Sequence, residues 1–101
     1  MRLKTGIRAS ALLRQADAAG LFGAVLRKGD PDGGVILVVA READGVRLYG
    51  ERGGRFEPRV VDDGSGAVEA AIAREAEFDR DLWVLEVEGR GAGALLAAFE
   101  A

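Results

Sequence analysis

The chain has 101 residues, of which 49% are hydrophobic and 31% charged, and its formal net charge is -3. This balance excludes an intrinsically disordered chain and predicts a single globular domain over residues 1–101. Because the sequence contains no cysteine and no histidine, it excludes disulfides, thiol nucleophiles, imidazole bases and ordinary zinc or haem sites.

Charge is distributed unevenly along the chain. Residues 1–28 carry six basic side chains and one acidic one, whereas residues 62–101 carry three basic and ten acidic ones. The basic block could contact a phosphate backbone, but its residues are spaced singly and form no Lys/Arg run. We therefore expect the two ends to offset one another in the fold, and we do not expect nucleic acid as a partner.

The sequence predicts no targeting or membrane-spanning segment. Arg8 and Arg14 interrupt the only candidate for the apolar region of a secretory signal. The longest strongly apolar run, Val35–Ala40, is far shorter than a membrane span. We expect a cytoplasmic protein that does not contact a membrane.

The first half of the chain predicts a helix and then strands. Residues 9–19 have apolar side chains at helical spacing, and Gly20 suits the end of that helix. Residues 22–28 predict a strand, and Gly29–Gly34 is rich in turn-forming residues. Residues 35–42 are apolar on both pleat faces at their start, which predicts a central strand.

A two-residue hairpin turn is predicted at Asp44-Gly45, after which residues 46–51 return alongside the central strand. This register places Glu42 opposite Arg47 as a cross-strand ion pair. Alternation then sorts the strand residues onto two faces. One face holds Leu26, Val35, Leu37, Val39, Val46, Leu48 and Val61, and the other holds Val25, Ile36, Val38, Ala40, Arg47, Tyr49, Phe56 and Val60.

The second half of the chain predicts one more hairpin strand, a helix, a strand and a tail. Residues 55–61 form a strand that Pro58 assigns to a sheet edge, because proline cannot donate to a ladder. Residues 66–78 have the apolar stripe of a helix. Residues 82–88 alternate as a final strand, and residues 94–100 predict a short terminal helix.

These elements predict an α+β fold: an antiparallel sheet of about five strands with the two main helices packed on one face. If both helices cover the face with Leu37, the face with Tyr49 and Phe56 has two possible fates. It is either a partly apolar surface for a second copy or a protein partner, or it is covered by residues 94–99. The sequence leaves both alternatives open.

Four aspartates in two turns are candidates for chemistry. Asp30 and Asp32 have the spacing of a calcium loop, but the twelfth position from Asp30 is Arg41, where such a loop needs glutamate. Asp79 and Asp81 could serve as acid and base only if burial separated their pKa values. Turn formation in solvent explains all four residues, so we predict no metal ligand and no catalytic residue.

Other residues are candidates for binding. Trp83 could stack on a ligand, although a lone tryptophan in a strand is more often a core anchor. Arg27 and Arg74 are candidates as partners of these aspartates in a small enzyme site. The full set of candidate binding residues is Arg27, Asp30, Asp32, Tyr49, Phe56, Arg74, Asp79, Asp81 and Trp83, and no cofactor is predicted.

Several motifs resemble a family of proteins. The motifs that carry the resemblance include Arg27-Lys28-Gly29-Asp30, Arg74-Glu75 and Asp81-Leu82-Trp83. The chain resembles a small bacterial domain-of-unknown-function family, number 1491, over nearly its whole length. The chain departs from the family pattern at Arg80, where proline is common, and in its Gly/Ala-rich tail. The resemblance implies a stand-alone cytoplasmic domain and transfers no catalytic residue.

The sequence favours a non-enzymatic binding or regulatory module that self-associates or binds a protein partner. One alternative is a small carboxylate-dependent hydrolase or transferase that uses the aspartates with Arg27 or Arg74. Another is a nucleic-acid accessory protein that uses the basic N-terminal block.

Overall fold

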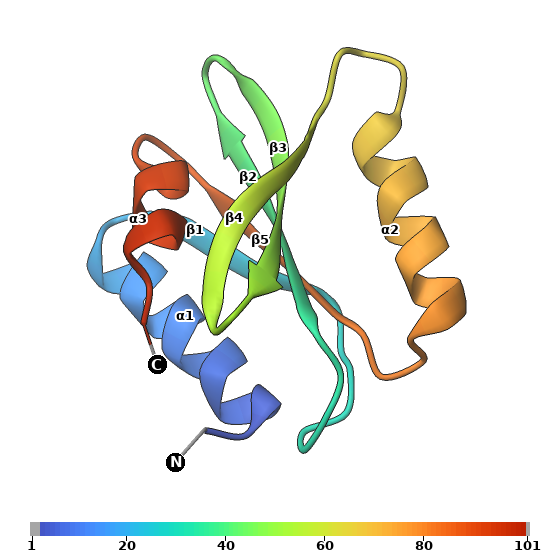
Figure 1. The fold of residues 1–101 in the computed structure, drawn as a ribbon. Helices are drawn as coiled ribbons and strands as arrows, with labels where there is room; N and C mark the ends of the chain where they lie inside the picture. Colours follow the sequence, from blue (N-terminus) through green and yellow to red (C-terminus); the bar gives the residue numbers. More distant parts are fainter. Residues whose placement is uncertain (1–2, 101) are drawn as a thin grey trace.

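The computed structural model describes residues 3–100, which form three helices and one five-stranded sheet (Figure 1). This confirms the predicted α+β class and strand number. The elements in chain order are α1 (Thr5–Ala18), β1 (Phe22–Arg27), β2 (Ile36–Glu42), β3 (Gly45–Arg52), β4 (Arg55–Val61), α2 (Ala67–Phe78), β5 (Trp83–Glu88) and α3 (Ala92–Ala98).

Helix α1 begins four residues earlier than predicted. Its buried stripe includes Thr5 and Arg8 as well as the apolar residues Ala9, Leu12 and Ala16. Apolar periodicity alone could not detect this first turn, because two of the residues that face the sheet are polar.

The strand order is β1-β5-β2-β3-β4. As predicted, β2 is central and β4, which carries Pro58, is an edge strand. The sheet is not wholly antiparallel, because β5 lies between β1 and β2 and runs parallel to β2. Since β4 and β5 therefore point the same way, the chain needs a crossover to join them, and α2 provides it.

The β2–β3 hairpin differs from the predicted register. Glu42 lies opposite Gly45, and Arg47 lies opposite Ala40 instead of Glu42. The turn therefore consists of residues 43–44, and Arg47 contacts the Asp44 carboxylate at 3.3 Å. The shift is two positions, so the side chains of β2 and β3 keep their predicted faces. Glu42 does not pair with Arg47 because its carboxylate binds the start of α3 instead.

A β-bulge in β4 corrects the predicted faces of two valines. Val60 lies opposite Leu48 and Pro58 opposite Tyr49, so Arg59 is an extra residue without a partner across the ladder. Val60 consequently packs with the cluster around Leu37, and Val61 changes to the opposite face. Simple alternation could not reveal this extra residue.

Helices cover both faces of the sheet, so the prediction that both main helices, α1 and α2, pack on one face is not confirmed. Figure 1 shows α2 on one side and α1 and α3 on the other. The α2 side contains a cluster of Leu37, Val39, Leu48, Val68, Leu82 and Val84. The crossover between parallel strands carries α2 over one face alone, and α1 is left to pack on the other.

The face with Tyr49 and Phe56 is covered. Helix α1 lies over β1 and β5, and α3 lies over β2 and β4. Phe99, just after α3, packs against Phe56 with ring centroids 5.9 Å apart, and both rings are buried. Of the two alternatives left open by the sequence, the structure shows the covered face, with α1 contributing as well as the tail.

A buried ion pair joins α1 to the sheet. The Arg8 guanidinium contacts the Glu51 carboxylate, and both side chains are almost fully buried. Glu51 also accepts the backbone N–H of Ile36 through Oε1 at 3.0 Å.

No helix within residues 3–100 combines the length and apolar character needed to cross a membrane.

Candidate functional site

The two turns that carry the candidate aspartates lie against each other. We call residues 27–35 and 79–83 the loop junction. Trp83 Nε1 donates to the Asp30 carbonyl at 2.8 Å, and the Asp30 N–H donates to the Asp81 carbonyl at 3.2 Å. The Arg27 guanidinium donates to the carbonyls of Leu82 and Arg80, each at 3.2 Å. The structure thus brings six of the nine predicted residues together, namely Arg27, Asp30, Asp32, Asp79, Asp81 and Trp83.

The aspartate carboxylates at the loop junction bind backbone amides. Asp79 accepts the N–H of Val35 through Oδ2 at 3.1 Å and that of Asp81 through Oδ1 at 2.9 Å. Asp30 Oδ1 accepts the N–H of Asp32 at 2.7 Å, which is an Asx turn. These bonds order the two turns, so use of Asp79 as an acid or base would require the junction to open.

Two glycines allow the turns to approach closely. A Cβ on Gly29 or on Gly34 would lie 2.1 Å from the Asp81 carbonyl oxygen. Gly34 also has a backbone φ of +80°, which residues other than glycine rarely adopt. The Arg-Lys-Gly-Asp turn and the Asp-Leu-Trp segment are therefore two halves of one packed contact.

Asp32 lies at the rim of the loop junction and pairs with Lys4 at 3.2 Å. The other three predicted residues lie elsewhere. Tyr49 and Phe56 are buried beneath α3. Arg74 lies on α2, beside a cleft over the opposite face of the sheet.

The basic N-terminal block is largely engaged within the molecule. Arg8 is buried against Glu51, Lys4 pairs with Asp32, and Arg27 binds the loop junction. Arg2 lies outside the described residues. Folding thus uses much of the positive charge that could have contacted a phosphate backbone.

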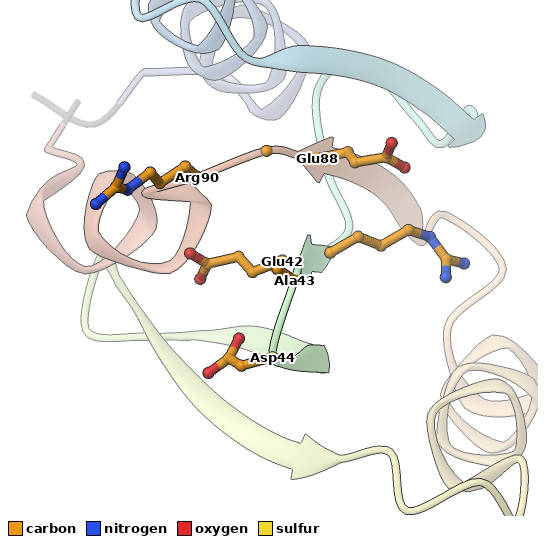
Figure 2. A pocket seen from close by; sticks show the side chains of 7 residues that line it. Glu42, Ala43, Asp44, Glu88 and Arg90 are labelled. Carbon is orange, nitrogen blue, oxygen red and sulfur yellow. The ribbon is translucent and has the colours of Figure 1, made fainter.

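A hollow of about 790 Å³ lies at the end of β2 and β5. Figure 2 shows Glu42 and Asp44 pointing to one side of it and Glu88 to the other. Glu42 is already engaged, because its two carboxylate oxygens accept the N–H groups of Gly91 at 3.0 Å and Gly93 at 3.1 Å. Glu42 thus fixes the start of α3 to the end of β2, and the three carboxylates do not converge on a ligand.

The described residues include no group of three or more His, Cys, Asp or Glu side chains placed to hold a metal ion. Two pKa values shift at exposed turns. The Ser65 hydroxyl, followed by its backbone N–H, lowers the pKa of the Asp63 carboxyl. The hydrogen bond to Asp44 raises the pKa of Arg47. Both shifts arise from local turn contacts.

Two surfaces were missed by the sequence reasoning. One is β1, where apolar side chains remain exposed, and the other is the cleft between α2 and the sheet. The apolar residues of β1 were visible in the sequence. Their exposure depends on which strand they pair with and which helix covers them, and neither could be predicted from the strand itself.

The family follows from a sequence comparison that extends over the loop junction and both layers. A family model described as a protein of unknown function, DUF1491, matches residues 3–97. The chain belongs to the DUF1491 family. This confirms the resemblance carried by the two junction motifs.

Solved DUF1491-like structures have the same fold. The solution structure of protein Atu0922 from A. tumefaciens is 37% identical, with a TM-score of 0.82 and coverage of 100% of this chain and 98% of the other. A crystal structure of a DUF1491 family protein from Caulobacter crescentus is 35% identical over 89% of each chain, with a TM-score of 0.78.

An NMR structure of a DUF1491 family protein from the same organism is 36% identical, with a TM-score of 0.79, and covers 95% of this chain and 94% of the other. The comparison with curated proteins found no match. The comparisons thus establish the DUF1491 family and its fold, and the family description assigns no activity.

Proposed function

We propose that the chain is a cytoplasmic protein-binding module that associates with a second copy of itself along β1. The observation that carries this proposal is the exposure of apolar side chains on an unprotected edge strand. Phe22, Val25 and Leu26 are 61%, 46% and 52% exposed, although all three belong to β1. Exposed apolar residues gathered on one element are typical of interaction sites.

The backbone of β1 also has an open side. In the described sheet β1 pairs only with β5, so its outer N–H and C=O groups face no other strand. Free strand edges accept strands from other chains through main-chain hydrogen bonds, and neighbouring side chains add specificity.

The opposite edge of the sheet is built differently. Strand β4 carries Pro58, a bulge at Arg59 and the charged residues Arg55 and Glu57. Each of these features discourages edge-to-edge pairing. Strand β1 also has a bulge, at Leu26, but it has neither a proline nor an acidic residue, and its only charge is Arg27 at its end. The contrast supports β1 as the edge used for binding.

Charge favours a second copy as the occupant. The strand runs into the basic pair Arg27 and Lys28, whereas Glu88 lies opposite Phe22 at its beginning. In an antiparallel pair of β1 strands, each basic end approaches the acidic end of the other copy. The same edge would bring two five-stranded sheets into one continuous sheet.

Light scattering and sedimentation of the full chain at increasing concentration test the proposal. The wild type is expected to shift from monomer to dimer, and Phe22→Lys is expected to remain monomeric because it places a charge in the apolar contact. Val61→Lys is the matched control, since Val61 is 59% exposed on the opposite edge strand.

A wild-type chain that stays monomeric at millimolar concentration would overturn self-association, and the partner would then have to be a different protein. A dimer that survives Phe22→Lys but not Val61→Lys would place the interface on β4 instead of β1. Backbone hydrogen exchange offers an independent check, because pairing should protect the β1 amides.

A further inference from the structure

The cleft between α2 and the sheet has the composition of a ligand site. Its floor consists of Leu37, Leu48 and Val60 from three adjacent strands. Ala71 and Glu75 contribute the helix side. The volume of about 320 Å³ is at the lower end of the range for small-molecule pockets, roughly 300–1,000 Å³. The apolar floor therefore suits a small apolar group.

The cleft exists because α2 presents small or partly buried side chains to the sheet. Only Val68 in this helix is fully buried, and Ala71 and Ala76 are among the side chains that face the sheet farther along. Ile72 also packs against the cluster around Leu37 but does not line the cleft, whose helix side beyond Ala71 consists of Arg74, Glu75 and Phe78. An apolar ligand could fill this space.

Arg59 forms one wall of the cleft, and its charge is balanced. Its guanidinium donates to the Glu51 carbonyl at 3.0 Å and to the Glu75 carboxylate at 3.3 Å. It lies across Gly50, where a Cβ would stand 2.2 Å from Arg59 Nε. The bulge in β4 and the missing side chain at Gly50 thus hold Arg59 in place.

Arg74 supplies the charge that remains unbalanced. It lines the same cleft and forms no ion pair or side-chain hydrogen bond with any other residue in the range 3–100. The cleft accordingly carries one positive charge beyond the Arg59–Glu75 pair. A guanidinium can bind a carboxylate through two parallel hydrogen bonds, and it does so more strongly beside an apolar surface than in open water.

Phe78 is the second independent indication of a ligand. It lines the cleft, about two helical turns after Ala71, yet its side chain is 86% exposed. A phenyl ring on the helix face that meets the sheet is normally buried. Here it lies at the cleft mouth, where a bound apolar chain would cover it.

We infer that this cleft binds a small monocarboxylic acid with an apolar chain. The chain lies against Val60, Ala71 and Phe78, above Leu37 and Leu48, which are 1% and 2% exposed. The carboxylate pairs with Arg74. This site does not depend on association through β1, because α2 lies over β3 and β4 at the other side of the sheet.

Octanoate and octanol are suitable probes, because they share an alkyl chain and differ in the negative charge. In ¹H–¹⁵N NMR titrations of the full chain, octanoate is expected to shift the amide signals of Leu37, Leu48 and Ala71 in a saturable manner. Octanol should bind at least about fivefold more weakly, which is the contribution expected of a partly exposed ion pair.

Arg74→Gln removes the charge at an exposed position, so the fold should be unaffected, and octanoate affinity is expected to fall about fivefold while octanol affinity is unchanged. Arg90→Gln, at the far end of β5, is the matched control and should bind octanoate like the wild type. Absence of saturable shifts at the cleft would overturn the inference. Equal affinity for octanoate in wild type and Arg74→Gln would do so as well.

Discussion

Replacement of Gly29 by alanine tests whether the loop junction holds the fold together. The new Cβ would stand 2.1 Å from the Asp81 carbonyl oxygen and 2.6 Å from Trp83 Cδ1. Real Cβ contacts essentially never fall below 3.0 Å, so the two turns must separate by about 1 Å. Gly29 has an ordinary backbone conformation, and the cost is therefore steric and not conformational.

The magnitude follows from the bonds beside Gly29. A separation of about 1 Å would break the Asp30 N–H bond to the Asp81 carbonyl, now 3.2 Å, and the Trp83 Nε1 bond to the Asp30 carbonyl, now 2.8 Å. Each is worth about 1 kcal/mol, and partial loss of Trp83 packing adds to this. We expect Gly29→Ala to lower the free energy of unfolding by about 2–3 kcal/mol.

Urea unfolding followed by the fluorescence of Trp83 measures this difference, because the chain contains one tryptophan and it is buried at the junction. Gly33→Ala is the matched control in the same turn, since a Cβ at Gly33 would have no neighbour within 4 Å. Its stability should stay within about 0.5 kcal/mol of the wild type. If the two variants unfold at the same urea concentration, the close approach of the turns does not stabilise the fold.

Two further predictions concern charged groups. Glu51→Gln leaves Arg8 buried without a counter-ion and should cost about 3–5 kcal/mol in urea unfolding, whereas the double replacement Arg8→Met with Glu51→Leu should recover most of this loss. A double variant no more stable than the single one would contradict this. Ser65→Ala should raise the pKa of Asp63, measured by ¹³C NMR titration, because the Ser65 hydroxyl is the main cause of its lowering. Since the folded pKa is below the unfolded value, Asp63 stabilises the wild type above about pH 4, and this contribution is lost as pH falls through the folded pKa. An unchanged pKa in the variant would rule out that cause.

Features encoded within a single segment were predictable from the sequence. The central position of β2 followed from its apolar residues on both faces, and the edge position of β4 followed from Pro58. The faces of Leu37 and Tyr49 were also correct in spite of the register shift, because a shift of two positions preserves alternation.

Features that depend on long-range contacts were not predictable. The position of β5 is set by the α2 crossover and cannot be detected in the residues of β5 itself. Burial of Arg8 depends on Glu51, which is far away in the sequence. The same limit applies to the site: the sequence identified the aspartates as turn residues, but only the fold shows that their two turns form one junction.

The position of β5 inside the sheet determines when the sheet can be completed during synthesis. Of the five strands in the described sheet, β5 is synthesised last, yet it is the one partner of β1 there and also pairs with β2. Until Trp83–Glu88 leaves the exit tunnel, the nascent chain offers the β2–β3–β4 meander beside an unattached first strand. Completion of the sheet is therefore a late event that depends on contacts distant in the sequence, and a chain whose translation stops after α2 would expose both β1 and a flank of β2 to other nascent chains.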